Sequence, residues 1–526
     1  MSDPVQPART VAVIDIGASA IRLRIAEINT AGHVRTLESL QQAVPLGKDT
    51  FTGGRIQPGT VEECVKILKG FRRIMAEYGV THPDQIRAVA TSAVREADNR
   101  DQFLDRIYMA TEINIEPIEG AEENRLTYIA IQDALKEEPY LREGDALIVD
   151  LGGGSTELLL VQEGRVTFAN SYRLGSLRIR ETLETYRAPA ARVRAVLDQH
   201  IRRTVEQLHR TVPIKRAASL VAVSGDAQFA ASLLSPLWAS KRMDVLDFKP
   251  FTALADKLAV MSVDDLVRKY RIPYQEAETL GAALLAYVQI ARMFDVKNIL
   301  VPKASLRDGL IEEMAAVGAW TDEFATQAAH SATTLAEKYQ IDRRHAEHVA
   351  AMCVQLFREL QPEHQLDNRY ELLLRIAALL HEIGGFISDR SHHKHSMYLI
   401  LNSDLFGLNR KDTTLIALVA RYHRRATPRP YHEEFQSLDR EGRIAVVKMA
   451  AILRVADGLE RSHLPQLREL SFGREKGQFV ITIHGTQDLT LERIALKEKG
   501  SMFEEVYGMP VLLRATRTAA GETDRG

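Results

Sequence analysis

Apolar and polar positions alternate with a period of two along residues 11–28, VAVIDIGASAIRLRIAEI, on both sides of a small Gly17-Ala18-Ser19 tip. Because successive side chains of a strand point to opposite faces, this alternation predicts two strands joined by a tight turn. Residues 146–161, ALIVDLGGGSTELLLV, have the same design of strand, Asp, glycine-rich turn and strand. The repetition predicts an internal duplication of one fold unit.

Helical and strand patterns alternate around these hairpins. A helical period covers residues 60–78 and 98–109, and a strand pattern covers residues 86–91. A third turn, at Ser224-Gly225, follows a short buried strand and precedes a helix. Alternation of this kind is typical of α/β layers, so the N-terminal part is expected to hold two similar α/β domains.

The pattern changes after Trp320, where little strand signal remains. Apolar positions then recur at helical spacing, which predicts a helical domain. Strand-like alternation returns in GQFVITIHG and VLLRATR, which predicts a small α/β appendage before a loose tail. The predicted helices cover residues 326–339, 343–360, 371–380, 412–422 and 442–459. The predicted domains are residues 1–125, 126–312, 313–465 and 466–526.

Composition agrees with a multidomain globular chain. Its 526 residues exceed the roughly 250–300 that one hydrophobic core supports. The 68 basic side chains nearly cancel the 70 acidic ones, so any attraction to a polyanion must come from local clusters and not from the overall field. No nucleic-acid partner is expected. Cys64 and Cys353 are too few for a disulfide framework or a Cys-rich zinc site and fit a reducing compartment. With no apolar stretch of signal-peptide or membrane-span length, a cytoplasmic protein without a membrane partner is expected.

The two hairpins carry a candidate phosphate chemistry. Asp15 lies beside Gly17, and Asp150 precedes three consecutive glycines. Glycine lets backbone amides converge on an anion, and a carboxylate at the base of the turn can hold Mg²⁺ that bridges to phosphate oxygens. A plain tight hairpin is the alternative for each turn, and it is weaker for the second turn, where Ser155, Thr156 and Glu157 follow. The pair predicts a phosphate-transfer cleft between two domains.

Five motifs in order carry a family resemblance: VIDIGASAIRL, ATSAVREA, IEGAEENRLTY, IVDLGGGSTEL and LRDGL. They resemble the motifs of the exopolyphosphatase and guanosine pentaphosphate phosphohydrolase family from about residue 10 to residue 312. LHEIG, SHHKHS and RYHRR extend the resemblance to about residue 425. It implies an α/β fold with two ribonuclease-H-like domains of the actin, Hsp70 and sugar kinase superfamily. An all-α HD-like domain and a small C-terminal α/β domain would follow.

The resemblance also implies roles for single residues. Glu123 matches the general base that activates water, and its neighbour Glu122 would point elsewhere. Asp15, Asp150 and Glu157 would hold Mg²⁺, with K⁺ as an optional stimulating ion. The phosphate-binding positions implied are Gly17, Ser19, Arg95, Gly152, Gly153, Gly154, Ser155 and Arg307.

Two turns depart from the family pattern. Ala18-Ser19-Ala20 stands where relatives have Ser-Asn-Ser/Thr, so side-chain donors to phosphate are missing. Asp226 stands where relatives have a threonine, and its carboxylate would repel phosphate unless a cation lies between them. These departures suggest weaker turnover and keep open a polyphosphate-binding or alarmone-binding protein without activity.

The helical domain carries two basic clusters around SHHKHS and RYHRR. A solvated charged face is the ordinary interpretation of such runs, but with the family resemblance a channel for polyphosphate is favoured. The predicted channel residues are Lys394, His395, Arg421, His423, Arg424 and Arg425.

His348, the pair His381-Glu382, and Asp457 occur in the order seen in HD-domain metal phosphohydrolases. Those enzymes have His-Asp as the central pair, and glutamate is one methylene longer. A packed helix pair without metal is therefore favoured over a metal site.

The predicted function is a Mg²⁺-dependent exopolyphosphatase that removes terminal orthophosphate from polyphosphate processively, with Glu123 as base. Guanosine pentaphosphate (pppGpp) is the alternative substrate, because the motifs are shared. Two further hypotheses stay open, a catalytically silent binding protein and an HD-type phosphohydrolase. The resemblance further implies a homodimer.

Overall fold

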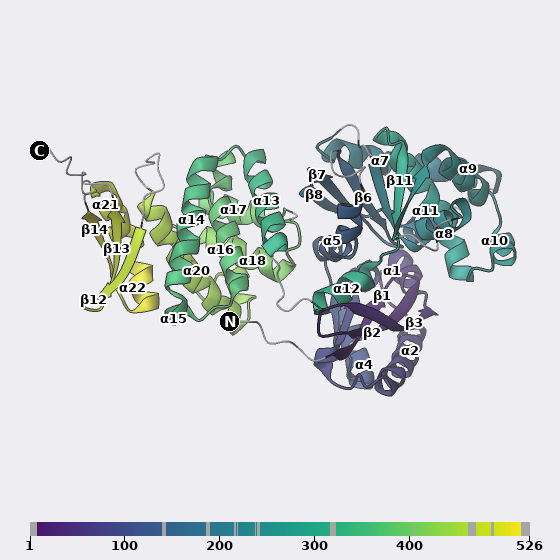
Figure 1. Cartoon of the computed structure of the whole chain (residues 1–526), viewed down its shortest axis with the longest axis horizontal. Coiled ribbons are helices and arrows are strands. Elements are labelled where there is room, and N and C mark those ends of the chain that lie inside the picture. The colour runs from purple at the N-terminus through teal and green to yellow at the C-terminus, as the bar shows by residue number, and fades with distance from the viewer. Residues whose placement is uncertain are drawn as a thin grey trace, which may run out of the picture. The chain divides into compact units, whose positions relative to one another are not determined.

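The computed structural model describes residues 8–138, 144–185, 190–214, 217, 219–236, 238, 242–315, 322–403, 405–424, 426–460, 470–484 and 489–516. The chain divides into two compact units, Met1–Ala319 and Trp320–Gly526 (Figure 1). The boundary falls close to the change of pattern that follows Trp320 in the sequence. The four domain boundaries given above stay predictions.

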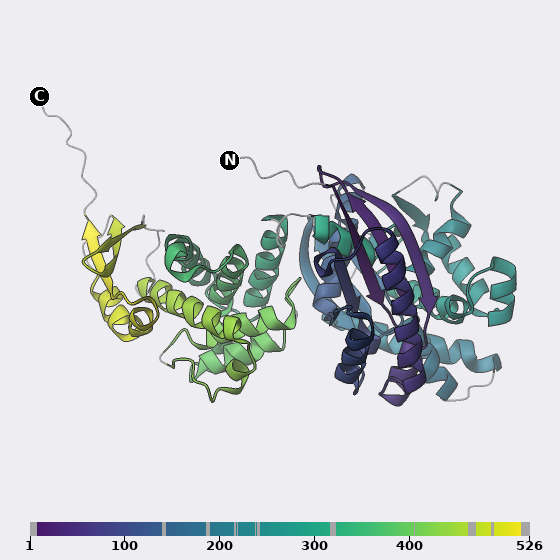
Figure 2. The same ribbon diagram turned by 90° about the horizontal axis from the view of Figure 1, so that it is seen from below.

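The first sheet of the N-terminal unit has five strands in the order β3-β2-β1-β4-β5. β1 pairs antiparallel with β2 and parallel with β4, and the long helix α2 packs beside them (Figure 2). The strands are β1 (Arg9–Ile16), β2 (Ala20–Ile28), β3 (Val34–Ala43), β4 (Ile86–Ala90) and β5 (Ile115–Pro117). The helices are α1 (Leu46–Gly53), α2 (Pro58–Glu77), α3 (Ser92–Arg95), α4 (Arg100–Thr111) and α5 (Gly120–Glu137), with a 3-10 turn at Pro83–Gln85.

The second sheet has six strands in the order β10-β11-β9-β6-β7-β8. Its strands are β6 (Ala146–Leu151), β7 (Thr156–Gln162), β8 (Arg165–Tyr172), β9 (Ser219–Val223), β10 (Met243–Asp247) and β11 (Asn298–Pro302). Its helices are α6 (Ser176–Thr185), α7 (Ala190–Thr211), α8 (Gly225–Leu234), α9 (Phe248–Ala259), α10 (Val263–Tyr270) and α11 (Tyr274–Met293). The last helix of the unit, α12 (Leu306–Ala315), returns to the first sheet, where Leu310 and Ile311 pack with Val11 and Val13.

The two sheets repeat one design. In each, an antiparallel hairpin lies beside a parallel strand, β4 beside β1 and β9 beside β6. The hairpin turns close identically, because Gly17 N donates to Ala20 O and Gly152 N donates to Ser155 O, both at 3.0 Å. The duplication predicted from the hydrophobic pattern is confirmed. The sequence pattern did not reveal β3, β5 or α1, which have few apolar positions or are short.

The second unit consists of helices followed by a three-stranded sheet. Arg454 of α20 is 1% exposed, and its Nε donates to Tyr422 O at 2.7 Å, which ties α20 to the end of α18. The helices are α13 (Asp322–Lys338), α14 (Arg343–Glu359), α15 (Gln361–His364), α16 (Asn368–Leu380), α17 (His392–Leu401), α18 (Arg410–Arg421), α19 (Glu433–Gln436) and α20 (Arg440–Leu459), with a 3-10 turn at Ile383–Phe386. The predicted helical character is confirmed.

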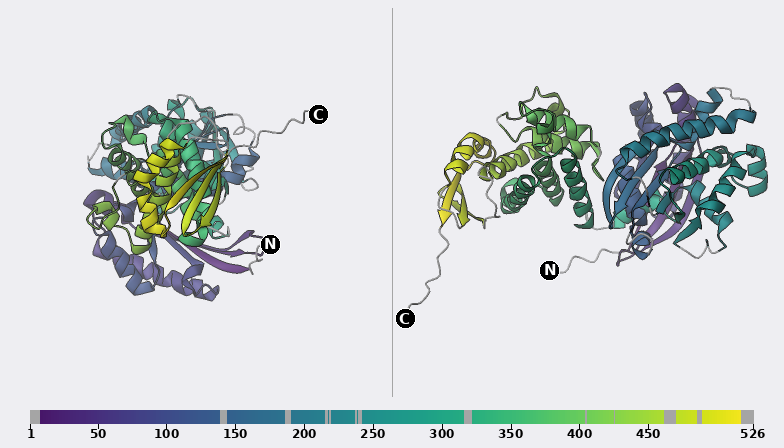
Figure 3. Two further views of the ribbon diagram at one scale, coloured as in Figure 1. Left: turned by 90° about the vertical axis from the view of Figure 1, so that its left-hand side faces the viewer. Right: turned by 90° about the horizontal axis from the view of Figure 1, so that it is seen from above.

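The C-terminal sheet has the order β12-β13-β14, with two helices inserted before its last strand (Figure 3). Its elements are β12 (Leu470–Glu475), β13 (Gln478–His484), α21 (Thr490–Lys499), α22 (Ser501–Tyr507) and β14 (Val511–Thr516). Phe479 and Phe503 are fully buried and their rings lie 5.5 Å apart, so α22 covers this sheet. In the described residues, no helix is long and apolar enough to cross a membrane.

Gly154 is expected to be intolerant of a side chain. A Cβ at this position would lie 2.3 Å from both Phe51 Cζ and Ser92 Oγ. Gly154→Ala should therefore lower the free energy of unfolding by about 1–3 kcal/mol, the usual cost of overpacking. The matched control is Gly70→Ala in the middle of α2, where a Cβ meets nothing within 4 Å and alanine should stabilise the helix by up to about 1 kcal/mol. Denaturant unfolding measures the free energy of unfolding of both variants. Equal values for Gly154→Ala and Gly70→Ala would contradict the close packing around Gly154.

Candidate active site

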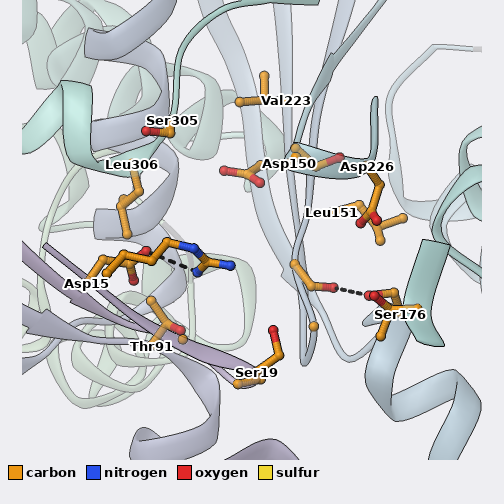
Figure 4. A pocket seen from close by; sticks show the side chains of 18 of the residues that line it. Asp15, Ser19, Thr91, Asp150, Leu151, Ser176, Val223, Asp226, Ser305 and Leu306 are labelled. Atoms are coloured by element: carbon orange, nitrogen blue, oxygen red, sulfur yellow. Dashed lines mark hydrogen bonds and ion pairs between the residues drawn. The ribbon is translucent and has the colours of Figure 1, made fainter. Parts of the chain in front are cut away.

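A cavity of about 390 Å³ opens between the two sheets of the N-terminal unit, at the tips of the two hairpins (Figure 4). Asp15, Asp150 and Asp226 point into it from different sides. The predicted site residues that line it are Asp15, Gly17, Ser19, Glu123, Asp150, Gly152, Gly153, Ser155, Glu157 and Arg307. Segments that lie almost 300 residues apart in the sequence are thus brought to one space.

The strand registers explain why the acids meet. Asp15 pairs with Arg22 across the first hairpin, and Asp150 pairs with Glu157 across the second. Arg22 and Glu157 therefore occupy equivalent places in the duplicated unit but have opposite charges. The first hairpin neutralises its aspartate, whereas the second adds a further carboxylate to it.

Asp15 lies between two arginines. Its Oδ2 is 3.5 Å from Arg22 Nη1 and 3.4 Å from Arg307 Nη1. Burial lowers the pKa of Arg307 to about 10, which still leaves the guanidinium charged near neutral pH. Asp15 is therefore compensated within the protein, and Arg307 is held in the cavity wall by it.

Glu123 lies in the first turn of α5 and is 8% exposed. Its Oε1 accepts a hydrogen bond from Arg95 Nη1 at 2.6 Å, and the same guanidinium group also donates to Ile118 O. Burial and the negative charge of Glu157 raise the pKa of Glu123 to about 8, against the opposing effect of Arg95. A carboxylate with a pKa near neutrality is suited to take a proton and release it again.

Glu122 points away from the cavity, as expected from the sequence. Its Oε1 accepts from Arg125 Nη2 at 3.2 Å and lies 3.7 Å from Arg87 Nη2. Burial, the largest influence, raises the pKa of Glu122. Of two adjacent acids in one motif, only Glu123 lines the cavity.

Asp150 and Glu157 are held by hydroxyl groups. Thr127 Oγ1 donates to Asp150 Oδ2 at 2.8 Å, and Ser171 Oγ donates to Glu157 Oε1 at 3.0 Å. Burial raises the pKa of Asp150 to about 7, and burial together with the charge of Asp150 raises the pKa of Glu157 to about 7. No arginine or lysine within the described ranges forms an ion pair with Asp150. The charge of Arg95 acts on Glu157, so Asp150 is the acid of the second hairpin that a bound cation would neutralise.

Asp226 lies in the first turn of α8, where Ser224 Oγ caps the helix by accepting from Ala227 N at 3.1 Å. The Asp226 carboxyl lines the cavity, and burial, followed by the charge of Glu276, raises its pKa to about 7. The cavity wall here also includes Phe229. This side of the cavity is acidic and partly apolar.

Two predicted phosphate-binding residues do not line the cavity. Gly154 faces Phe51 and Ser92, and its carbonyl accepts from Arg178 Nε at 2.8 Å. Arg95 lies behind Glu123 and holds it. The placement of Gly154 reflects close packing, because its missing Cβ leaves room for an aromatic ring.

Sequence reasoning missed four side chains that shape the site: Arg22, Thr127, Ser171 and Glu276. Arg22 could have been found, because pairing the two predicted strands of the first hairpin places it opposite Asp15. Thr127 lies one helical turn after Glu123, which puts both on one face of α5. Ser171 and Glu276 lie on β8 and α11, elements that the pattern did not connect to the site.

The predicted channel residues of the helical unit are not all on the surface. Lys394 and Arg424 are exposed, and His395 and Arg421 are half-buried. His423 is 1% exposed and its Nε2 lies 3.1 Å from His392 Nε2, so it does not belong to a surface cluster. Arg425 lies outside the described residues.

The HD-like set is also corrected in one position. His348 Nδ1 lies 3.0 Å from Glu460 Oε1 and takes no part in the group around His381. His345, one helical turn earlier, contributes instead, together with His381 and Asp457. Glu382 has its Oε2 3.8 Å from His345 Nε2, and its side chain is 42% exposed. The period of α14 allowed either histidine to face the group, and packing selected His345.

Two α/β domains with matching aspartate hairpins that face one acidic cavity are typical of an actin-like α/β fold. The chain belongs to the Ppx/GppA phosphatase family, which matches residues 25–317, and domain III of the Ppx/GppA phosphatases matches residues 329–498. The resemblance inferred from the five sequence motifs is confirmed. The fold is the actin-like α/β fold of this family with a C-terminal helical domain.

Similar proteins agree with this family. A guanosine-5'-triphosphate,3'-diphosphate pyrophosphatase of Aeromonas hydrophila is 26% identical over 454 residues, which cover 85% of this chain and 86% of the relative. A protein of the same name from Aeromonas salmonicida is 25% identical over the same length. The crystal structure of an exopolyphosphatase from Cytophaga hutchinsonii is 23% identical, has a TM-score of 0.52, and covers 58% of this chain and 98% of its own. That last likeness concerns the fold.

Proposed function

We propose that this chain hydrolyses the terminal phosphoanhydride bond of a polyphosphorylated substrate in the cavity of the N-terminal unit. The observation that carries the proposal is the buried carboxyl of Glu123, which has a raised pKa and shares one cavity with the two hairpin turns. Glycine turns suit the phosphates, and Glu123 suits the water that attacks them.

Mg²⁺ fits the donor set of the second hairpin. Carboxylate oxygens are its preferred protein ligands, and it is usually held by one or two of them together with substrate phosphates. Asp150 and Glu157 offer such a pair, whereas Asp15 is already paired with Arg22 and Arg307. Within the part of the chain that the structure describes, no three cavity carboxylates have oxygens within 4.8 Å of one another. When bound, the ion would neutralise charge on the phosphates.

The protein's own groups would divide the remaining work. Arg307 would contact phosphate oxygens, and the amide of Gly153 would donate to the terminal group, because the amide of Gly152 already closes the hairpin turn. Glu123 would accept a proton from water as the water oxygen attacks the terminal phosphorus, and the bond to the bridging oxygen would break. Arg95 would orient Glu123 and stabilise its charged form through the 2.6 Å contact.

Mg²⁺ is expected to stabilise the fold more strongly at pH 8 than at pH 5.5. Asp150 and Glu157 have folded pKa values near 7, above the values of exposed carboxyls, so the folded state holds extra protons and loses stability as the pH rises through these values. The ion binds the deprotonated form and competes with those protons. Thermal unfolding with and without millimolar Mg²⁺ at the two pH values measures the effect. An equal shift at both would contradict a site built on these acids.

Two substrates are candidates. Linear polyphosphate is the one that the family motifs and the exposed cations Lys394 and Arg424 suggest. Guanosine pentaphosphate is favoured by the names of the two Aeromonas relatives and by the cavity wall itself. Asp226 and Glu276 would repel a further run of phosphates. Their carboxylates could instead accept hydrogen bonds from a nucleoside, and the ring of Phe229 could pack against it.

The test is orthophosphate release from long-chain polyphosphate and from guanosine pentaphosphate in parallel, with Mg²⁺ present. Asp226→Asn distinguishes the two substrates. Removing this charge should raise the rate of orthophosphate release from polyphosphate and should not raise the rate of release from guanosine pentaphosphate. Gln228, which is close to Asp226 in the sequence, is not a suitable control position, because its Nε2 donates to Pro302 O and Ala304 O and a change to glutamate would break these bonds. Lys249→Gln on α9, which does not line the cavity, serves instead. Release from neither substrate would refute the proposal.

A further inference from the structure

Three histidines of the helical unit share one local arrangement. Each has its Nδ1 within hydrogen-bond distance of a backbone carbonyl three residues earlier. A carbonyl can only accept, so each Nδ1 carries a proton, and in its neutral form each ring presents a lone pair on Nε2. The pairs are His381 with Ala378 at 2.7 Å, His423 with Ala420 at 2.6 Å, and His392 with Asp389 at 3.3 Å.

Two of these histidines lie at the ends of consecutive helices. His381 directly follows α16, and His392 begins α17. Gly384 joins the two segments closely, since a Cβ there would lie 2.1 Å from His392 O. Ser396 Oγ accepts from Gly384 N at 2.9 Å and donates to His381 O at 2.7 Å. The backbone around the rings is therefore held in place without using any Nε2.

His381 meets a second histidine and an acid in the interior. Potential ligand atoms of His345, His381 and Asp457 all lie within 4.8 Å of one another, and the three side chains are 5%, 0% and 6% exposed. His381 Nε2 is buried and has no hydrogen-bond partner among the described residues. Buried polar atoms nearly always have a hydrogen-bond partner or another ligand, so a bound ligand is expected at this nitrogen.

Asp457 faces the group with one oxygen. Its Oδ1 lies 3.9 Å from His345 Nε2, while Oδ2 is bound by Lys499 Nζ. The lysine fixes the carboxylate and leaves Oδ1 directed toward the histidines. Outer partners of this kind commonly orient metal ligands.

His392 and His423 point at each other. Their Nε2 atoms are 3.1 Å apart, and the His423 ring also meets the His381 ring edge-on at 5.0 Å. With both Nδ1 atoms donating to carbonyls, the two Nε2 lone pairs face each other, which is unfavourable unless a cation lies between or beside them. That cation is a proton or a metal ion.

We propose that His345, His381 and Asp457 form a site for a divalent transition metal of the Zn²⁺ type, with the His392-His423 pair beside it. Imidazole nitrogens with one carboxylate suit Zn²⁺, Fe²⁺ or Ni²⁺, whereas Mg²⁺ prefers oxygen. Two histidines and one acid leave coordination positions open for water or an anion. The site lies in the unit Trp320–Gly526 and is independent of the proposed phosphohydrolase activity.

The test is metal retention by the full chain. The protein is stripped with a chelator, exposed to Zn²⁺ or to Mg²⁺, desalted, and its metal content is measured by mass spectrometry. Wild type should keep stoichiometric Zn²⁺ and no Mg²⁺. His381→Gln and His345→Gln should each weaken Zn²⁺ binding by about 100-fold or more. His348→Gln, one helical turn from His345 and outside the group, is the matched control and should bind like wild type.

Folding is checked on the metal-free forms, because His381 is fully buried. Circular dichroism should show both ligand variants folded, and added Zn²⁺ should raise the unfolding temperature of wild type and His348→Gln but not of the ligand variants. Failure of folded wild type to retain Zn²⁺ would overturn the proposal and leave a shared proton between His392 and His423. Equal loss of Zn²⁺ in His348→Gln would overturn the ligand assignment.

Discussion

Glu123→Gln is expected to lower orthophosphate release by about 100- to 10,000-fold, the usual contribution of a general base. The glutamine carbonyl can still accept the hydrogen bond from Arg95, so the geometry of α5 should persist while the proton acceptor is lost. Binding of substrate should change little, so the loss should appear in kcat and not in KM. Steady-state phosphate release at pH 8 with Mg²⁺ measures it.

Glu122→Gln is the matched control for this variant. The two acids are adjacent in the same first turn and are both buried, but Glu122 contacts Arg125 and Arg87 and does not line the cavity. Its change to glutamine is expected to affect stability and to leave kcat within a few-fold. Comparable losses in both variants would remove Glu123 from the role of base.

Asp150→Asn should have opposite effects on activity and on stability. Loss of the carboxylate removes a proposed Mg²⁺ ligand, and release should fall by about 100-fold or more at any Mg²⁺ concentration used. Without metal at pH 8, however, the variant should be more stable than wild type, because a buried carboxyl with a pKa of about 7 must ionise there at a cost of several kcal/mol. Thr127 Oγ1 can donate to the asparagine oxygen as before.

Asp15→Asn offers the contrast. Asp15 neutralises Arg22 and Arg307, so its replacement leaves two partly buried guanidinium groups without a counter-charge and should destabilise the fold by about 1–3 kcal/mol. Chemical unfolding at pH 8 compares the two variants. Destabilisation of the same size by Asp150→Asn would contradict the assignment of uncompensated charge to the second hairpin.

The hydrophobic pattern predicted the elements that hold the cavity. Both hairpins could be recognised in the sequence because apolar and polar residues alternate with period two along their strands. The repeated Asp-x-Gly turn placed Asp15 and Asp150 at equivalent positions. The family motifs then pointed to Glu123, which no periodicity would have separated from Glu122. Short or polar elements such as β3 and β5 were missed, since their stability comes from pairing with neighbours and not from their own sequence.

Contacts between distant segments could not be read from the sequence. The choice of His345 over His348 depends on how α14 rotates against α16 and α20, and both histidines fit the helical period. The burial of His423 within a run of basic residues likewise follows from helix packing. The family resemblance implied that Gly154 binds phosphate, but here the missing side chain of this glycine makes room for Phe51.

Hydrolysis in water labelled with heavy oxygen tests the central claim most directly. If water activated by Glu123 attacks the terminal phosphorus, the label should appear in the released orthophosphate and not in the remaining polyphosphate or nucleotide. Mass spectrometry of both products decides the point. Label in the remaining chain, or release of orthophosphate without label, would contradict attack by water on the terminal phosphoryl group in this cavity.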